Sequence, residues 1–166
     1  QVGMHKWIMS FDLNSLYPHL IMQYNISPET LVNSEDGIVE GMVDKILEGK
    51  TQNKTKYCMT PNGAFFRKDI KGFLPQLMEN MYNDRVKYKK LTLEARQKFE
   101  DTGDRNLLKV ISRYNNIQMA KKISLNSAYG AIGNNWFRYY DLMVATAITT
   151  SGQLSIRWIE KSINIY

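Results

Sequence analysis

The apolar positions between residues 6 and 50 change their spacing several times, which indicates short elements of mixed type. Lys6–Asp12 (KWIMSFD) predicts a short buried strand that ends in a carboxylate. Ser15–Gln23 predicts a short helix, because it begins with a cap-like serine and has Pro18 in its first turn. After a loop at Asn25–Thr30, apolar residues with helical spacing predict a second helix within Gly37–Gly49.

A β-hairpin is predicted next, over Lys56–Lys68. Two apolar stretches flank Pro61-Asn62-Gly63 there, and Asn-Gly supplies the positive φ angles that a tight turn requires.

From Phe73 onward the pattern is helical. One long helix is expected over Phe73–Glu100, and a second over Asp104–Tyr129, with Asp101–Asp104 as the break between them. Two long helices joined by a short loop form an antiparallel hairpin. Gly130 and Gly133 are expected to interrupt the chain, and a third helix follows from about residue 141. The fold class is therefore mixed α/β and mainly helical.

The net charge of +6 is unevenly distributed along the 166 residues. Residues 67–122 hold 14 basic and 7 acidic residues, whereas residues 1–66 hold 5 and 7. Such a concentration favours a polyanionic partner such as nucleic acid, nucleotide phosphates or an anionic membrane. A charged helix pair that is merely solvated remains the alternative at this point.

Composition excludes several other classes. An apolar content of 43% is normal for a globular protein, and the apolar runs are too short to cross a bilayer. Cys58 is the single cysteine, so an internal disulfide and a thiolate zinc site are excluded, and a catalytic thiol has little support. With only His5 and His19 as histidines, soft-metal chemistry is disfavoured as well.

The first candidate cluster is Asp12-Leu13-Asn14-Ser15-Leu16-Tyr17-Pro18. A carboxylate that directly precedes a helix can hold a hard cation, and the N–H groups of the next turn can hold phosphate oxygens. One short segment would thus bind both halves of a metal–nucleotide complex. From the residues alone, Asp12 as a simple helix cap is an equal alternative.

The second cluster is Lys121–Gly130 (KKISLNSAYG). In a helix, Lys122, Asn126 and Tyr129 share one face and offer a cation, an amide and an aromatic ring. Arg85 and Lys89, four residues apart on the preceding helix, could converge with them on one polyphosphate. The alternative is a charged helix surface with the tyrosine in the core.

Both clusters resemble motifs of the family B (alpha-like) DNA polymerases: DLNSLYP resembles motif A, and KKISLNSAYG resembles motif B. NISPET and NNWFRYYDLMVATAITTSGQ resemble the polymerases of large tailed bacteriophages in particular. The resemblance extends from about residue 7 to residue 166. It implies a partial palm with motif A at residues 1–70, a two-helix fingers hairpin with motif B at residues 71–130, and a helix that returns to the palm at residues 131–166.

The resemblance also implies residue roles. It makes Asp12 the catalytic carboxylate and a metal ligand, with the Leu13 carbonyl as a second metal contact. The residues implied to bind the incoming deoxynucleoside triphosphate are Ser15, Leu16, Tyr17, Arg85, Lys89, Lys122 and Asn126. Among these, the Tyr17 ring would lie under the sugar and leave no room for a 2′-hydroxyl. Tyr129 and Gly130 would contact the template and the nascent base pair.

As cofactor the resemblance implies Mg²⁺, two ions in a complete enzyme. The implied partners are primer–template DNA, deoxynucleoside triphosphates, and a sliding clamp with other replication proteins, but no membrane. The implied location is the cytoplasm of an infected bacterial host. The activity would be that of a DNA-directed DNA polymerase, a nucleotidyltransferase that extends a primer 3′ end and releases pyrophosphate.

The sequence departs from the family pattern in three respects. His19 and Asn14 replace the serine and the small residue that many relatives carry. The Asp-Thr-Asp core of motif C does not occur, and Asp101-Thr102-Gly103-Asp104 has the wrong pattern to replace it. We therefore expect a fragment that is inactive alone, with an incomplete palm sheet and exposed apolar surface.

Two other functions are compatible with part of the sequence. A non-catalytic nucleic-acid-binding helical module would explain the basic segment but not the two motifs together. An RNA-synthesising enzyme is disfavoured, because the bulky Tyr17 would lie where the sugar binds.

Overall fold

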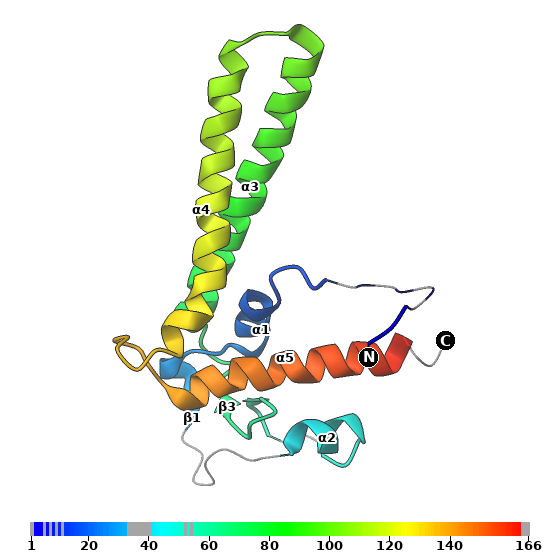
Figure 1. Cartoon of the computed structure of the whole chain (residues 1–166). Helices are drawn as coiled ribbons and strands as arrows, with labels where there is room; N and C mark the ends of the chain where they lie inside the picture. The colour runs from blue at the N-terminus through cyan, green and yellow to red at the C-terminus, as the bar shows by residue number, and fades with distance from the viewer. Residues whose placement is uncertain are drawn as a thin grey trace.

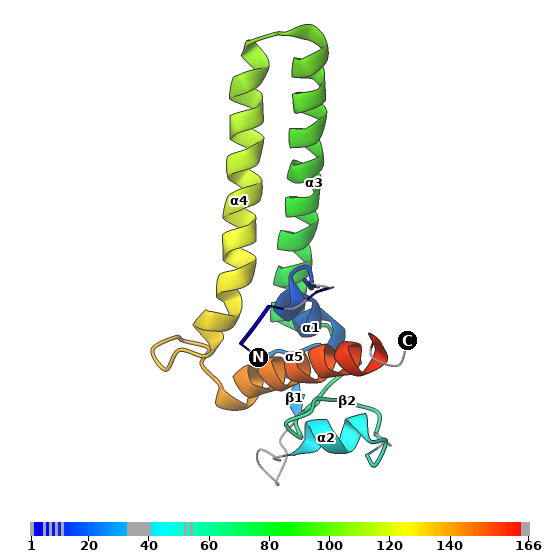
Figure 2. The ribbon, with the colours of Figure 1, turned by 45° about the vertical axis from the view of Figure 1, so that its right-hand side comes forward.

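The computed structural model describes residues 2–4, 6, 8, 10, 12–32, 41–51, 53 and 55–163. Its helices are α1 (Leu16–Tyr24), the 3₁₀ helix η1 (Pro28–Thr30), α2 (Met42–Leu47), α3 (Phe73–Thr102), α4 (Asn106–Ile132) and α5 (Leu142–Ile163). Its strands are β1 (Leu31–Val32), β2 (Cys58–Met59) and β3 (Phe65–Phe66). Helices α3 and α4 rise side by side from a base that contains α1, α5, the small sheet and α2 (Figures 1 and 2). The mixed, mainly helical fold class is confirmed.

The α3–α4 pair is the antiparallel helical hairpin that the sequence predicts, with helices of 30 and 27 residues. Gly103 ends α3 in the left-handed region (φ 68°), and its N–H donates to the Phe99 carbonyl. The break lies two residues later than expected, because α3 continues to Thr102 and α4 begins only at Asn106. Gly130 does not interrupt α4, which runs on to the buried Ile132 before Gly133 ends it. The packing of that last turn outweighs the poor helix propensity of one glycine.

The beginning of α3 is held by side chains from the segment after α1, 44 or more residues earlier in the chain. Three successive backbone N–H groups donate to them. The acceptors are Asn25 Oδ1 for Gly72 (2.9 Å), a Glu29 carboxylate oxygen for Phe73, and Ser27 Oγ for Leu74 (3.3 Å). These bonds satisfy donors that the first turn of a helix leaves without partners. The segment predicted as a plain loop therefore fastens the helical hairpin to the base.

The three-stranded sheet is antiparallel, with the order β1-β3-β2. Strands β2 and β3 form the predicted β-hairpin, with Cys58 opposite Phe66. Its turn differs from the expectation, because only Gly63 has a positive φ (87°). The Gly63 N–H donates to the Thr60 carbonyl and the Thr60 N–H to the Ala64 carbonyl, which is the three-residue turn with a glycine bulge.

Asn62 does not adopt a positive φ in the turn; its side chain instead connects the turn to α5. Its side chain is fully buried. The amide nitrogen donates to the Met143 carbonyl and to Thr146 Oγ1, both at 2.9 Å, and its oxygen accepts from Thr60 Oγ1 at 2.7 Å. The tip of the β-hairpin is thereby tied to the first turns of α5.

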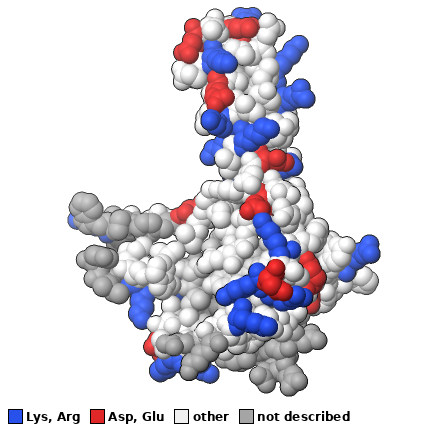
Figure 3. Space-filling view, turned by 180° about the vertical axis from the view of Figure 1, so that it is seen from behind, with Lys and Arg blue, Asp and Glu red and all other residues white. Residues whose placement is uncertain are grey.

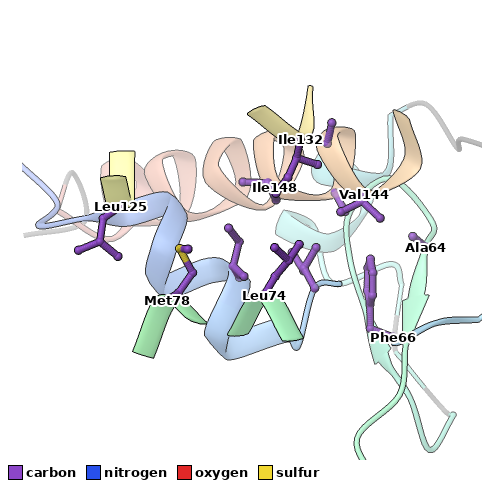
Figure 4. Close-up of a cluster of buried hydrophobic side chains, with 12 residues drawn as sticks. Ala64, Phe66, Leu74, Met78, Leu125, Ile132, Val144 and Ile148 are labelled. Atoms are coloured by element: carbon purple, nitrogen blue, oxygen red, sulfur yellow. The ribbon is translucent and has the colours of Figure 1, made fainter. Parts of the chain in front are cut away.

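One hydrophobic core joins the elements of the base to the foot of the helical hairpin (Figure 4). The β-hairpin, α3, α4 and α5 each contribute two of the labelled side chains, which are Ala64, Phe66, Leu74, Met78, Leu125, Ile132, Val144 and Ile148. All eight are at most 5% exposed. The upper part of the hairpin adds few buried residues, which include Thr92 and Ala95 of α3.

The predicted strand at Lys6–Asp12 is not found where the structure describes that segment. Trp7, Met9 and Phe11 lie outside the described residues, and the described residues between them are exposed and in no strand. A strand requires a neighbour for its backbone N–H and C=O groups, and the three strands of the described ranges pair only with one another. The described part of Gly37–Gly49 does contain the expected helix, α2. No helix in these ranges has the length and hydropathy to span a bilayer.

Candidate nucleotide-binding site

A cavity of about 620 Å³ opens at the foot of the helical hairpin. Its wall combines the start of α1 and the residues before it with side chains from α3, α4 and α5. The lining residues are Asp12, Leu13, Asn14, Ser15, Leu16, Tyr17, Pro18, Arg85, Lys122, Asn126, Ile156 and Ile159. Both sequence clusters therefore meet in one place, although more than 100 residues separate Asp12 from Lys122.

The N-terminus of α1 faces this cavity without a side-chain cap, contrary to the expectation for Ser15. Ser15 is in the left-handed region (φ 53°), and its hydroxyl accepts from Arg85 Nη1 at 3.1 Å. Its carbonyl instead accepts from the backbone N–H of His19 and lies 2.9 Å from the His19 ring nitrogen Nδ1. The first backbone N–H groups of α1 therefore remain for an anion, which helix N-termini bind well.

Two cations from opposite helices reach the same wall, Arg85 of α3 and Lys122 of α4. Arg85 Nε is buried and has no acceptor in the described part of the chain, so the guanidinium has hydrogen-bonding capacity left for a ligand. Lys121 points elsewhere, since its Nζ lies 2.8 Å from an Asp84 carboxylate oxygen. The hydrogen bond and the charge of Lys121 lower the pKa of Asp84, and the pair links the two helices beside the cavity.

Lys89 and Gly130 are not part of the cavity wall. Lys89 is exposed one turn further up α3 than Arg85. Gly130 is exposed on α4, with open space where a side chain would be. Asn126, in contrast, lines the cavity one turn after Lys122, as its spacing predicts.

The half-buried Tyr17 ring lies between two helices at the back of the cavity. Its centroid is 4.9 Å from that of Tyr129 on α4, with the ring planes tilted by 51°. On its other side the ring rests against the backbone of α5 at Gly152. The position of the Tyr17 ring is thus determined by α4 and α5 together.

Asp12 is exposed and is the single carboxylate among the described residues that line the cavity. Nowhere in the described ranges do three His, Cys, Asp or Glu side chains gather as a metal cluster would require. Mg²⁺, however, is commonly bound by one or two carboxylates together with the phosphates of a substrate. The cavity wall therefore suits a metal ion bound to a polyphosphate: Asp12 can bind the metal ion, and Arg85 and Lys122 can bind the phosphates.

Comparison with known proteins decides the family. The family model described as DNA polymerase family B matches residues 1–165. The chain belongs to this family. It is 32% identical to the DNA-directed DNA polymerase of Escherichia phage RB69 and 33% identical to that of Enterobacteria phage T4, over 98% and 97% of its length. The DNA polymerase 1 of Pyrococcus abyssi is 30% identical over 97% of this chain.

The fold agrees with that assignment. The family B DNA polymerase of the archaeon Pyrobaculum calidifontis superposes on 90% of this chain with a TM-score of 0.63, at 22% sequence identity. The chain spans 22% of the length of the two phage polymerases and 17% of the archaeal structure.

Three features of this family B chain were missed by sequence reasoning. Ile156 and Ile159 line the cavity, and Gly152 lies one turn before Ile156 and two turns before Ile159 on α5. Their spacing of four and seven residues was a readable signal for one helix face. Trp136, 95% exposed between α4 and α5, has no periodic pattern around it that would single it out from the family-like stretch.

Cys58 carries no sign of catalytic use. It lies on β2, and burial raises the pKa of its thiol despite the nearby charge of Lys68. A nucleophilic cysteine requires the opposite shift, since the thiolate is the reactive form.

Proposed function

We propose that this chain forms the nucleotide-binding centre of a DNA-directed DNA polymerase and contributes one of the carboxylates that hold its metal ions. The observation that carries the proposal is the meeting of Asp12, the uncapped N-terminus of α1 and the cations Arg85 and Lys122 around one cavity. A deoxynucleoside triphosphate with its metal offers the complementary chemistry: phosphate oxygens for the cations and N–H groups, and a cation for the carboxylate.

In the proposed reaction, the 3′-hydroxyl group of a primer gives its proton to water, and its oxygen forms a bond to the α-phosphorus of the nucleotide. The bond from that phosphorus to the bridging oxygen breaks, and pyrophosphate leaves with the electron pair. Bound Mg²⁺ would supply charge neutralisation for the attacking and leaving oxygens, held by Asp12, by the Leu13 carbonyl and by a carboxylate outside the described residues. Arg85, Lys122 and Asn126 would orient the triphosphate, together with the N–H groups of Ser15 and Leu16.

The remaining assignments follow from this role. We take residues 1–70 as part of a palm, the helical hairpin as fingers, and residues 131–166 as the return to the palm. Lys89 is one turn away from the cavity, so its proposed phosphate contact requires a tilt of the hairpin toward the base on binding. Tyr129 and Gly130, near the end of α4, are assigned to contacts with the template and the nascent base pair. We propose primer–template DNA and a sliding clamp as partners. The proposed location is the cytoplasm of an infected bacterium.

The loop after α4 supports a DNA partner. Trp136 is exposed, and the Arg138 guanidinium lies 5.6 Å from the centre of the Tyr139 ring. Exposed aromatic side chains with adjacent arginine are typical surfaces for unpaired bases. We propose that Trp136 stacks on a template base beyond the nascent pair.

The test uses the full natural polypeptide that contains this sequence. Asp12→Ala should reduce primer extension by at least about 10³-fold, because the carboxylate acts on the reacting phosphate through metal. Primer–template binding, measured by anisotropy at fixed salt, should stay within about twofold, since the same carboxylate makes no phosphate contact with DNA. Asp101→Ala, an exposed acid at the tip of the helical hairpin, is the matched control and should extend normally. Extension that survives Asp12→Ala would remove this residue from the metal site.

A second test separates the polymerase from a non-catalytic DNA-binding module. Metal-dependent binding of a deoxynucleoside triphosphate should weaken about tenfold in Lys122→Ala, because one direct phosphate contact is lost. Arg113→Ala, an exposed cation further up α4, should leave nucleotide affinity unchanged. Equal, salt-dependent losses of DNA affinity in both variants, with no nucleotide effect, would favour the binding module.

A further inference from the structure

Gly152 lies in the middle of the 22-residue helix α5 and is buried. Its φ is not positive, so the backbone does not require glycine there. Glycine is also among the weakest helix formers. A buried glycine at such a position indicates that the neighbouring element needs the space of a side chain. Ile156 and Ile159, one and two turns later on α5, line the cavity, so Gly152 belongs to the face of α5 that closes the site.

The neighbour of Gly152 is the Tyr17 ring. A Cβ atom at Gly152 would lie 2.9 Å from Tyr17 Cε1, 3.7 Å from Tyr17 Cδ1 and 3.8 Å from Leu16 Cδ2. Carbon atoms in contact are normally about 3.5–4.0 Å apart. A methyl group would therefore have to displace the ring by an appreciable part of an ångström. The other two distances are ordinary van der Waals contacts, so the steric conflict is with the Cε1 atom of the Tyr17 ring alone.

The ring has few directions in which to move. Tyr129 lies on its α4 side at a centroid distance of 4.9 Å, and α5 lies on the side from which the methyl group would press. The cavity is the open side, and Tyr17 already forms part of its wall. A side chain at position 152 would thus push the ring into the space of the ligand.

We propose that Gly152 is a positioning residue for nucleotide selection: its missing side chain lets the Tyr17 ring lie back against α5 and so determines how deep the sugar subsite is. The inference rests on the proposed role of Tyr17 beneath the sugar. With glycine, the subsite admits a deoxyribose and excludes a 2′-hydroxyl. With alanine, the ring moves forward and the deoxyribose loses room as well. Gly152 touches no substrate and acts only through Tyr17.

The alternative is a purely structural glycine that lets α1 pack closely on α5. The two explanations differ in what removal of the Tyr17 ring does. If Gly152 acts through the ring, alanine at position 152 becomes harmless once residue 17 is small. If Gly152 serves general packing of the helices, the cost of alanine persists and affects stability rather than substrate binding.

The experiment is a double-mutant cycle in the full natural polypeptide, with primer extension measured at varied concentrations of deoxynucleotide and ribonucleotide. Gly152→Ala should raise KM for the deoxynucleotide about tenfold, since displacements near 1 Å at a reacting centre have effects of this order or larger. kcat should change less than KM, and the exclusion of ribonucleotides should not relax. In the Tyr17→Ala background, Gly152→Ala should have no further effect on KM. Ser151→Ala is the matched control, because Ser151 is the buried neighbour on α5 and its hydroxyl has no partner among the described residues.

A folded Gly152→Ala variant with unchanged KM, or an equal rise in KM in the Tyr17→Ala background, would overturn the inference. If Gly152→Ala folds poorly, thermal unfolding gives the answer. Gly152→Ala should lower the midpoint in the wild-type background and leave it unchanged in the Tyr17→Ala background, whereas an equal drop in both backgrounds would favour general packing. A different result would contradict the proposed function itself: a wild-type polypeptide that does not extend primers. In that case fluorotyrosine at position 17 still reports on the ring, because its ¹⁹F resonance should shift in Gly152→Ala and not in Ser151→Ala. An unshifted resonance would refute the positioning role.

Discussion

At the scale of single residues, the guanidinium of Arg85 is only partly satisfied by hydrogen bonds within the described residues. Its Nη1 donates to Ser15 Oγ, whereas its Nε is buried without an acceptor in the described ranges. A buried donor without a partner is costly, and a charged one more so. A phosphate oxygen would relieve this cost, and the planar guanidinium could then contact the phosphate and Ser15 at the same time.

Arg85→Lys tests this geometry while it keeps the charge. We expect nucleotide affinity to fall about tenfold, because an ammonium group cannot reproduce the forked contacts of a guanidinium. The affinity would be measured by titration of the folded chain with a deoxynucleoside triphosphate and Mg²⁺. Arg96→Lys, at an exposed position on α3, is the control and should bind normally. Equal affinities in all three proteins would show that only the charge of residue 85 matters.

Tyr17 leads to a second expectation at this scale. Its ring is confined by Tyr129 and by the backbone at Gly152, so it cannot swing aside for a larger sugar. Tyr17→Ala should therefore relax ribonucleotide exclusion, by about 10²-fold or more in the ratio of kcat/KM values. Competition between labelled deoxynucleotide and ribonucleotide during primer extension measures that ratio. An unchanged preference would mean that another group senses the 2′ position.

Sequence patterns predicted which residues meet at the site better than how they meet. The i, i+4 spacing brought Lys122 and Asn126 to one wall, as expected. The conformation of Ser15 was not foreseen, because a left-handed serine that accepts from an arginine 70 residues away is a tertiary feature. Asn62 was read as a turn residue because of its neighbour Gly63, whereas burial against α5 explains it.

At the scale of elements, the decisive feature is the attachment of α3. Asn25 lies in the left-handed region (φ 55°), and its amide nitrogen donates to the carbonyls of Arg67 and Ile70 while its oxygen accepts from Gly72. Together with Ser27 and Glu29 it fixes where the helical hairpin begins. The helices themselves were predictable from local periodicity, but this attachment joins segments more than 40 residues apart and left no local signal.

Glu29 makes the attachment dependent on pH. Partial burial raises the pKa of its carboxyl, but the hydrogen bonds from the Phe73 N–H and the Ser27 hydroxyl outweigh burial and lower the pKa below its usual 4.5. Because the pKa is lower in the folded state than in the unfolded chain, the ionised carboxylate stabilises the fold at pH values above the unfolded-state pKa. This contribution is lost as the pH falls through the lowered pKa, so the acid side of the stability profile should depend on Glu29.

Glu29→Gln is the corresponding test. We expect a loss of about 0.5 kcal/mol of stability at pH 7, at the low end for a helix cap because Glu29 is solvent-exposed. Thermal unfolding from pH 7 to pH 3 should show less acid destabilisation in the variant than in the wild type. Glu94→Gln, an exposed acid within α3, should retain the wild-type profile. Parallel pH profiles for the wild type and Glu29→Gln would contradict the role of this carboxylate.

At the scale of the whole molecule, the basic excess of residues 67–122 does not form a continuous basic patch on the face seen in Figure 3. Acidic and basic side chains are interspersed along the helical hairpin on the face seen in Figure 3. Of the basic residues in this segment, only Arg85 and Lys122 line the cavity. The charge of this segment therefore reaches the cavity only at the foot of the hairpin, through Arg85 and Lys122, and a polyanionic partner stays a prediction.

The last expectation concerns apolar surface on the base. Trp158 and Ile156 on α5 are 62% and 54% exposed, and Leu13 beside the cavity is 37% exposed. Leu13 and Ile156 both line the cavity, and exposed large apolar side chains such as these and Trp158 favour association. We expect the 166-residue chain to self-associate at micromolar concentration and to unfold over a broad temperature range, as light scattering and calorimetry would record.

Trp158→Gln should reduce this association, because it removes the largest exposed apolar group of α5. Leu93→Gln is the matched control, since Leu93 is 56% exposed on the hairpin but has the charged Arg96 and Glu94 nearby in sequence. We expect it to leave association unchanged. If the wild-type chain is instead a monomer with one sharp, cooperative transition, the apolar face of α5 is compatible with a stable isolated fold. The hairpin and the base would then form one cooperative unit through the core at Leu74, Met78 and Ile132.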